Sequence, residues 1–296
     1  MSDDFIDDEP GATPPESGFG EVAIQRYKNQ TCSDDTDFVA REVPVALVYN
    51  GISHAVMLAT PLNLIDFAVG FSFSEGIIQH RSDIYDIEEI VHPDVGIEVH
   101  LTIAASDFAK LKERRRTLAG RTGCGLCGLE SLTEFEAGIE IGNATSLQQD
   151  AEFQITEQAL FNAFHALQKT QAINQVTGSM HAAAWINSNG DVLTVREDLG
   201  RHNALDKLIG ALMQARMSTS DGAVIMTSRA SYELAQKTAR ARIPLLATIS
   251  APTSLAIELA QKNKLTLIGF VRHASMVVYS YGARVKSEFV SSGGDV

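Results

Sequence analysis

Cysteine, basic residues and long apolar runs are all scarce in this chain of 296 residues. Only Cys32, Cys124 and Cys127 occur, and the last two share one C-x-x-C, so we expect no disulfide framework and a reducing, cytoplasmic compartment. No run of about 18 apolar residues is present, which excludes a transmembrane helix. The first residues also lack the basic-then-apolar pattern of a secretory signal.

Basic residues are outnumbered by acidic ones. Lys and Arg total 24 against 37 Asp and Glu, so the formal net charge is −13. Sequence-independent nucleic-acid binding needs a broad cationic surface, and this composition argues against it. An anionic ligand would need a local cluster of Arg, Lys and backbone N–H groups. Hydrophobic residues make up 45% of the chain, which is typical of a globular protein with a substantial core.

The chain divides into four predicted segments. Residues 1–20 carry six acidic residues, no Lys or Arg, and several Pro and Gly, which predicts a disordered acidic tail. Residues 21–118 predict a small N-terminal α+β unit. Residues 119–150 predict a mobile loop and linker around the C-x-x-C, and residues 151–296 predict an α/β domain that binds a ligand.

Hydrophobic periodicity predicts the elements of the two folded segments. In the first, residues 43–49 and 52–58 predict strands joined by a hairpin turn at Asn50-Gly51, and a helix begins near Pro61 with Thr60 as its cap. In the second, short apolar strands alternate with amphipathic helices. This alternation predicts a largely parallel sheet with helices on its faces, and ligands of such sheets bind beyond the carboxyl ends of the strands.

The C-x-x-C of Cys124 and Cys127 is compatible with three chemistries: half a zinc site, a dithiol redox couple, or a sulfur-carrying thiol with a helper. Zinc needs four ligands, and the chain has no second C-x-x-C or paired histidines, so we expect no structural metal. Four glycines surround the pair at positions 120, 123, 125 and 128. They favour a loop that moves between two partners over a fixed redox site at a helix N-terminus.

A second polar cluster lies between a predicted strand and helix, from Glu197 to Lys207. Arg201, His202 and Asn203 stand at the predicted helix N-terminus, which favours binding of an anion. An ordinary surface pair is the simpler interpretation of Asp206 and Lys207.

Three more strand ends carry hydroxyl or basic residues. They are Thr227-Ser228-Arg229, Ser250 to Ser254, and Gly269 to Ser275. If the four clusters meet at one sheet edge, together they predict a nucleotide-like or multiply phosphorylated ligand. No P-loop motif is present, so the chain is not a P-loop NTPase.

The segment His181-Ala-Ala-Ala184 resembles the His-Ala-Glu signature of zinc-dependent nucleobase deaminases. Those enzymes use the glutamate as general acid and base, and a C-x-x-C downstream of it binds the zinc. Here Ala183 takes the glutamate position and the C-x-x-C lies upstream. Deaminase catalysis is therefore disfavoured, while a related fold stays possible.

Taken together, these motifs resemble the FdhD family of formate dehydrogenase accessory sulfurtransferases, from about residue 40 to residue 285. The resemblance rests on Gly120 to Gly128, His181 to Ala184, Glu197 to Lys207, Thr227 to Arg229, Ser250 to Ser254 and Gly269 to Arg272. It implies a cytidine-deaminase-like three-layer α/β fold and a homodimer.

The resemblance also implies a function. A cysteine desulfurase would pass sulfur to Cys124 as a persulfide, with Cys127 as helper. The sulfur would go to the molybdenum of a bis-(molybdopterin guanine dinucleotide) cofactor, bound as substrate, before insertion into formate dehydrogenase; GDP would mimic its nucleotide ends. The family's cofactor-binding stretch corresponds to Phe270, Val271, Arg272, His273, Ala274 and Ser275, and we add Arg201, His202, Asn203, Ser228 and Arg229 as contacts.

Two other functions fit the same residues. A cofactor chaperone would hold the dinucleotide and transfer no sulfur, so it would function without Cys124. A dithiol oxidoreductase would need both Cys124 and Cys127 and would cycle through their disulfide.

Overall fold

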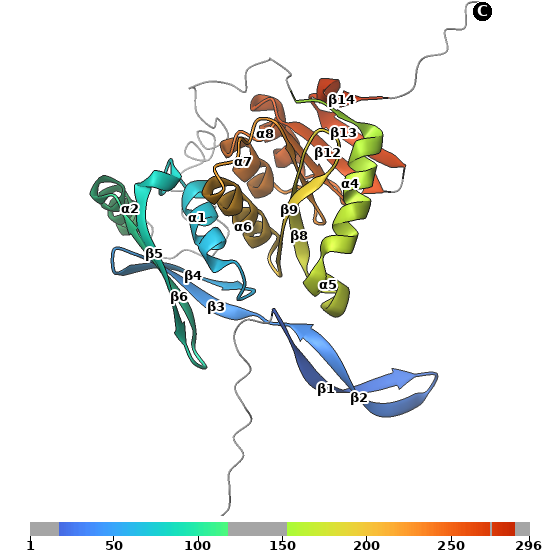
Figure 1. Ribbon diagram of the computed structural model, residues 1–296, viewed down its shortest axis with the longest axis horizontal. Helices are drawn as coiled ribbons and strands as arrows, with labels where there is room; N and C mark the ends of the chain where they lie inside the picture. The colour runs from blue at the N-terminus through green and yellow to red at the C-terminus, as the bar shows by residue number, and fades with distance from the viewer. Residues whose placement is uncertain (1–17, 118–152, 273, 288–296) are drawn as a thin grey trace, which may run out of the picture.

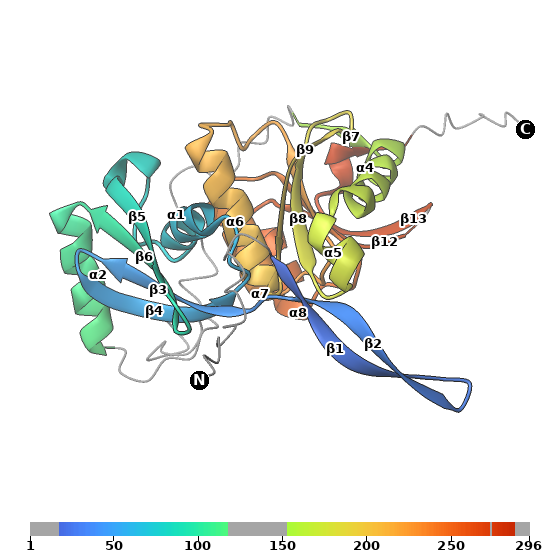
Figure 2. The ribbon, with the colours of Figure 1, turned by 60° about the horizontal axis from the view of Figure 1, so that its bottom comes forward.

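The computed structural model describes residues 18–117, 153–272 and 274–287. Its N-terminal part holds a long hairpin, β1 (Phe19–Lys28) and β2 (Thr31–Ala40), which projects away from the body (Figure 2). Asn29 and Gln30 form its turn, both with positive φ, as two-residue hairpin turns require. The hairpin was not predicted, and β1 begins inside the segment that we assigned to the acidic tail.

A four-stranded sheet with one helix on its inner face follows the hairpin. Its strand order is β4-β3-β6-β5, formed by β3 (Val43–Tyr49), β4 (Ile52–Ala59), β5 (Ile84–His92) and β6 (Gly96–Ile103). The helix α1 (Leu64–Ser74) packs on this sheet, and α2 (Ala105–Thr117) ends the unit. The hairpin at Asn50-Gly51 is as predicted.

The cap of α1 differs from the prediction. Asn63, in a left-handed conformation, precedes the helix, and Thr60 lies buried upstream of it. The Thr60 N–H instead donates to Asp198, 138 residues away. A local pattern of Thr followed by Pro cannot reveal such a distant bond.

The second part is a three-layer α/β/α domain built on a six-stranded sheet of order β13-β12-β11-β10-β8-β9 (Figure 1). The strands are β8 (His181–Ile186), β9 (Val192–Asp198), β10 (Ala223–Met226), β11 (Leu245–Thr248), β12 (Thr266–Arg272) and β13 (Ser275–Ser280). One face carries α6 (Arg201–Gln214), α7 (Tyr232–Arg240) and α8 (Ser254–Lys262). The other carries α4 (Glu157–Thr170), which α5 (Ala172–Thr177) follows.

Alternation along the strands fills both faces of this sheet. In β8, Ala183 and Trp185 face the core shared with α6, α7 and α8, while Ala182, Ala184 and Ile186 face the core shared with α4. Two short strands, β7 (Ile155–Thr156) and β14 (Val285–Lys286), pair beside α4.

The prediction of a mostly parallel sheet is wrong. Only the pairings β10–β11 and β11–β12 are parallel; β12–β13, β10–β8 and β8–β9 are antiparallel. Helices α7 and α8 make the crossovers that parallel strands need, whereas β8 and β9 are joined by a short turn at residues 187–191, which permits only a hairpin. Among the described residues, no helix is long and apolar enough to cross a membrane.

The two parts join where α1 crosses α6 at very close range. Gly70 of α1 lies against the Asp206 carbonyl oxygen, and Gly210 of α6 lies against that of Asp66. A Cβ at either glycine would collide with that backbone oxygen, so the crossing admits no side chain at these positions.

We therefore expect Gly210→Ala to destabilise the protein by about 1–3 kcal/mol or more, because the added methyl group must push the two helices apart. Urea unfolding of the full chain measures this loss. Gly282→Ala is the matched control, since its Cβ would meet only Val278 at 3.5 Å, and its change should stay within about 0.5 kcal/mol. Equal unfolding midpoints for the two variants would contradict the prediction.

Candidate functional site

The carboxyl ends of β10, β11 and β12 lie side by side, and backbone hydrogen bonds join the segments that follow them. Ile249 N–H donates to the Met226 carbonyl at 3.2 Å, and Ser250 N–H donates to the Ser228 carbonyl at 3.4 Å. Phe270 N–H donates to the Ser250 carbonyl at 3.4 Å. Three of the four predicted polar clusters therefore meet at one sheet edge.

The start of β8 joins the same edge because β8 runs antiparallel to β10. The Thr227 hydroxyl accepts from Ala182 N–H at 2.9 Å, and Thr227 N–H donates to the Ala182 carbonyl at 3.1 Å. His181 is paired in register with Asp198, the last residue of β9. The fourth cluster, around the N-terminus of α6, is thus held beside the others.

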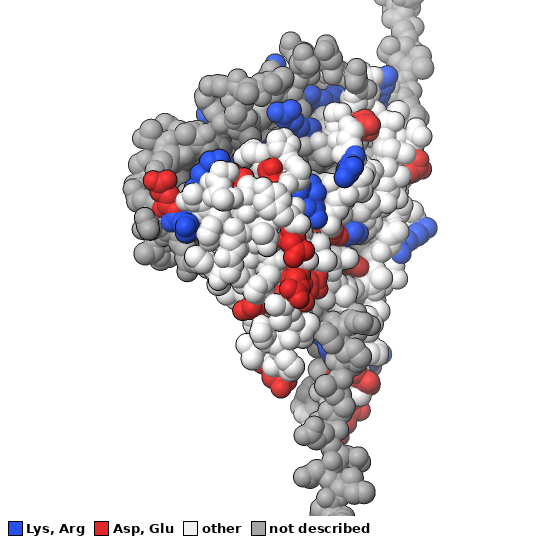
Figure 3. All heavy atoms as spheres, turned by 60° about the vertical axis from the view of Figure 1, so that its left-hand side comes forward, with Lys and Arg blue, Asp and Glu red and all other residues white. Residues whose placement is uncertain are grey.

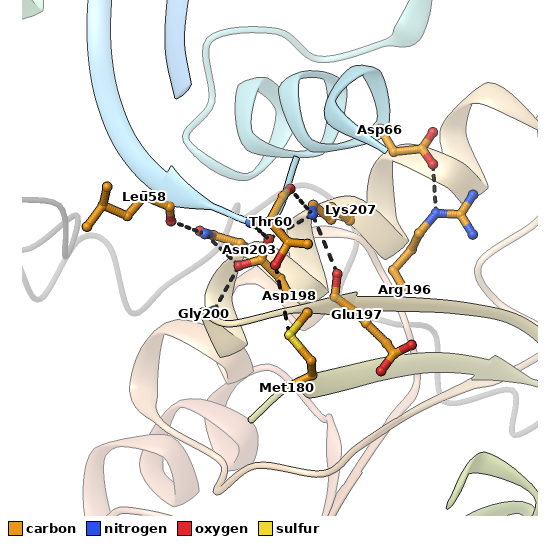
Figure 4. A network of polar contacts seen from close by, with 10 residues as sticks. All are labelled: Leu58, Thr60, Asp66, Met180, Arg196, Glu197, Asp198, Gly200, Asn203 and Lys207. Atoms are coloured by element: carbon orange, nitrogen blue, oxygen red, sulfur yellow. Dashed lines mark hydrogen bonds and ion pairs between the residues drawn. The ribbon is translucent and has the colours of Figure 1, made fainter. Parts of the chain in front are cut away.

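Asp198 is the centre of a buried polar network at that N-terminus (Figure 4). Its carboxylate accepts from Gly200 N–H at 2.8 Å, Asn203 Nδ2 at 3.0 Å and Thr60 N–H at 3.0 Å. Lys207 Nζ lies 2.7 Å from the carboxylate and also donates to the Thr60 carbonyl at 3.0 Å. This network fastens the end of β4 to the first turns of α6.

The interpretation of Asp206 and Lys207 as a surface pair is wrong. Both side chains are fully buried, and each has another partner: Lys207 pairs with Asp198, and Asp206 with Lys237 at 2.6 Å. Adjacent residues on a helix point in different directions, so these two cannot face each other. Burial lowers the pKa of Lys207, and the Asp198 charge opposes that shift.

Asn203 is only 4% exposed, and its Nδ2 donates to the Leu58 carbonyl at 2.9 Å as well as to Asp198. Both of these hydrogen bonds are to groups inside the fold, so Asn203 has a structural role: it helps to hold the N-terminus of α6 in place. Ser228 is likewise buried, and its hydroxyl donates to the Arg229 carbonyl. Arg229 itself is exposed at the edge.

Arg201 and His202 open α6 and are partly exposed. His202 Nε2 pairs with a carboxylate oxygen of Glu233, and the Ser231 hydroxyl lies 3.5 Å from the same nitrogen. Burial opposes ionisation of Glu233, yet the hydrogen bond and charge of His202, aided by Lys237 and Arg201, lower its pKa below the ordinary value. The pair holds the imidazole in one orientation at the edge.

His181 differs from His202 in its electrostatics. Burial lowers its pKa, and the positive charges of Arg201 and His202 lower it further, against a weaker effect of Asp198. The edge therefore holds one histidine whose pKa is lowered and one that is paired with a carboxylate.

The predicted cofactor-binding stretch includes the end of β12, at Phe270, Val271 and Arg272, and the first residue of β13, Ser275. Phe270 has a φ of 55°, a left-handed conformation that is rare for a bulky residue, and its side chain is 42% exposed. Val271 is buried, while Arg272, Ala274 and Ser275 are exposed; His273 lies outside the described residues. A strained residue that presents an aromatic ring is a feature of binding sites.

Cys124 and Cys127 lie outside the described residues. Cys32 lies exposed on β2 as a free thiol. Within the described part, no group of three or more His, Cys, Asp or Glu side chains is placed to hold a metal ion.

Sequence reasoning missed Glu233, which it treated only as part of a helix-capping pattern. The sequence does contain an indication of its role. Glu233 lies in the first turn of a helix that follows Ser228 and Arg229, which were already predicted as contacts. It also missed the internal role of Asp198, because its partner Thr60 is remote in sequence.

Comparisons with known proteins find similar sequences and a similar fold. The model of the FdhD/NarQ family matches residues 40–286. The sulfur carrier protein FdhD of Cupriavidus necator is 52% identical over 266 residues, which is 90% of each chain. That of Burkholderia cenocepacia is 48% identical over 94% of this chain and 98% of its own.

A crystal structure described as a formate dehydrogenase accessory protein, from Desulfotalea psychrophila, has a similar fold. The TM-score is 0.71 at 21% identity, and the match covers 91% of this chain and all of that one.

We expect Lys207→Met to lower the free energy of unfolding by about 3–5 kcal/mol, because it leaves the Asp198 carboxylate buried without a counter-charge. Urea unfolding measures the loss. Adding Asp198→Asn to Lys207→Met should recover part of it. Lys262→Met, which breaks an exposed pair with Glu258, should cost about 0.5 kcal/mol or less. A loss in Lys207→Met as small as in this control would contradict the role of the network.

We expect His181 to titrate below the ordinary histidine value of 6.5. Between its folded pKa and 6.5 the unfolded chain binds a proton that the folded chain does not, so the free energy of unfolding should rise with pH across that window. NMR of the imidazole resonances against pH measures the midpoint. Arg201→Gln should raise it, because a positive neighbour is removed; a wild-type midpoint at or above 6.5 would refute the account.

Proposed function

This chain belongs to the FdhD/NarQ family, and we propose that it is a sulfur carrier that serves a formate dehydrogenase. The observation that carries the proposal is the identity of about half of all residues, over nine-tenths of the chain, with proteins named sulfur carrier protein FdhD. The pair Cys124 and Cys127 supplies the nucleophilic sulfur that such a function needs.

The first step loads sulfur onto Cys124. The Cys124 thiolate attacks the outer sulfur of a persulfide on a cysteine desulfurase. A new sulfur–sulfur bond forms at Cys124, the bond in the desulfurase persulfide breaks, and the desulfurase cysteine leaves as a thiolate. No net oxidant is consumed in this exchange.

The second step releases the outer sulfur at the level of sulfide. The Cys127 thiolate attacks the inner sulfur of the Cys124 persulfide, so that a Cys124–Cys127 disulfide forms and the outer sulfur leaves as hydrosulfide with the electron pair of the broken bond. The molybdenum of the bound substrate takes up this sulfide. A cellular dithiol then reduces the disulfide and restores both thiols.

The acceptor is the bis-(molybdopterin guanine dinucleotide) cofactor, bound as substrate at the edge where β10, β11 and β12 end. Exposed Arg229 and Arg272, with Arg201 at the N-terminus of α6, supply positive charge and N–H donors for its pyrophosphates. The exposed Phe270 ring offers a stacking surface for a base. His202, held by Glu233, supplies a further donor.

The family resemblance extends the proposal in three respects. The three-layer domain has a cytidine-deaminase-like architecture, two copies of the chain form a homodimer, and the protein acts in the cytoplasm. A reducing compartment suits the chemistry, because both cysteines must return to thiols in each cycle.

Loading the purified chain with a cysteine desulfurase and cysteine tests the proposal. We expect intact mass to show one added sulfur atom, peptide mapping to place it on Cys124, and a reducing thiol to remove it. Cys124→Ala should take up none, whereas Cys127→Ala should take up sulfur and fail to release hydrosulfide.

Cys32→Ala is the matched control, since it removes the exposed thiol of β2 and should load like the wild type. GDP binding should survive in all three cysteine variants. An unmodified wild type that still binds GDP would favour the cofactor chaperone instead. Loading that survives in Cys124→Ala and disappears in Cys32→Ala would place the carrier thiol on the hairpin.

A further inference from the structure

A polar pocket of about 510 Å³ lies at the C-terminal end of α6, away from the edge described above. Because α6 spans 14 residues, its two ends lie about 20 Å apart. The pocket is lined by His80, Arg81, Ser82, Gln214 and Arg216. Two guanidinium groups, an imidazole and a hydroxyl thus surround one space on a protein of net charge −13.

The carboxylates nearest in sequence to this pocket are already engaged by other groups. Asp83 accepts from the N–H groups of Gln79 and His80, at 2.9 and 2.8 Å. Asp66 accepts from Arg196 at 2.7 Å and from the Gln214 amide. In the described part of the chain, no ion pair of Arg81 or Arg216 is present, while His80 Nδ1 lies 3.9 Å from Asp83.

The backbone places Arg216 at the pocket although its conformation suits glycine. Arg216 has a φ of 53° at the first position after the helix cap, and the pattern of N–H bonds from Arg216 to Met213 and from Met217 to Leu212 is a Schellman motif. An L-residue in this conformation is less favourable than glycine. Arg81 is held from the other side, since its Nη1 donates to the Ile84 carbonyl at 3.0 Å.

The helix dipole alone does not account for this arrangement. Arg242 and Lys264 occupy the same left-handed position after α7 and α8, with φ of 55° and 54°, and cations are favoured at helix C-termini in general. Arg216 differs because it shares a pocket with a second arginine, a histidine and a serine that come from the segment before β5. At the end of α6 the cation thus meets donors from another part of the fold.

Figure 3 shows the face of the molecule on which the N-terminal unit comes forward. Lysine and arginine atoms are distributed over the upper half of the described surface there, while the largest group of acidic atoms lies lower down. Acidic atoms lie between the basic ones in that upper half, so the basic side chains form no separate patch there.

We propose that the pocket between the Arg81 segment and the end of α6 binds the phosphoryl group of a small organic phosphate. Two guanidinium forks and the Ser82 hydroxyl together offer donors to all three terminal oxygens of a phosphate ester. The volume of the pocket suits a ligand larger than the phosphoryl group alone. This site is separate from the sulfur-carrying cysteines and from the edge that binds the acceptor, so it goes beyond the function proposed above.

Calorimetric titration of the full chain with pyrophosphate, at constant ionic strength, tests the proposal. Arg216→Gly removes the guanidinium and leaves a residue that prefers the existing backbone, so folding is preserved. We expect the pocket's affinity to fall about tenfold or more, as the loss of a charge-assisted bond implies. Arg81→Gln should also lower the affinity for pyrophosphate.

Arg242→Gly is the matched control, because it makes the same change at the same helix position outside the pocket. Its pyrophosphate affinity should stay within about twofold of the wild type. Arg201→Gln should leave this binding component in place, which separates it from any binding at the acceptor edge. Wild-type affinity in Arg216→Gly, or an equal loss in Arg242→Gly, would overturn the proposal whether or not Cys124 carries sulfur.

Discussion

The Asp198 carboxylate is wholly buried, and Lys207, the Asn203 amide and two backbone N–H groups surround it. A buried charge pair contributes little net stability compared with a well-packed apolar pair, but removing either partner is severe. Because of this asymmetry, the pair favours one arrangement of the two elements. Only one placement of β4 against α6 lets every donor reach the Asp198 carboxylate. The first turn of α6, with Arg201 and His202, takes its position from that placement.

Further ion pairs, partly or fully buried, lie at or near the same boundary. Arg196 of β9 meets Asp66 of α1, and Lys237 of α7 meets Asp206 of α6 and, at 3.6 Å, Glu75 after α1. The N-terminal unit and the α/β domain are thus joined by ion pairs as well as by the close contact of α1 and α6 at Gly70 and Gly210. These contacts fix the edge where β10, β11 and β12 end relative to the N-terminal unit, and a site held in this way can orient a ligand.

Local pattern was sufficient to predict much of the α/β domain. The apolar runs of β10, β11 and β12, each followed by polar residues, correctly placed those residues at one edge, because parallel strands with crossover helices leave no other choice. The caps of α4 and α8 are local features of the same kind: Thr156 and Thr253 each accept from the backbone N–H three residues later. These features depend on contacts within a few residues.

The predictions that were wrong concern features that depend on contacts between residues far apart in the sequence. The sheet is mixed because β8 and β9 form a hairpin and β13 folds back on β12. The apolar pattern of a single strand does not indicate which strand it pairs with, or in which direction. Lys207 looked like a surface residue because its partners, Thr60 and the end of β9, are brought to it by the tertiary fold. The neutral state expected for His181 likewise follows from burial and two neighbouring cations, not from its own segment.

The close crossing of α1 and α6 has a consequence for synthesis on the ribosome. Gly70 and Gly210 are 210 − 70 = 140 residues apart, so at about 5–20 residues per second the nascent N-terminal unit waits on the order of ten seconds for its partner helix. During that interval the face of α1 that will meet α6, with Phe73 beside it, has nothing to cover it. We therefore expect the yield in the cell to depend on protection of that face during translation as well as on the stability of the finished fold.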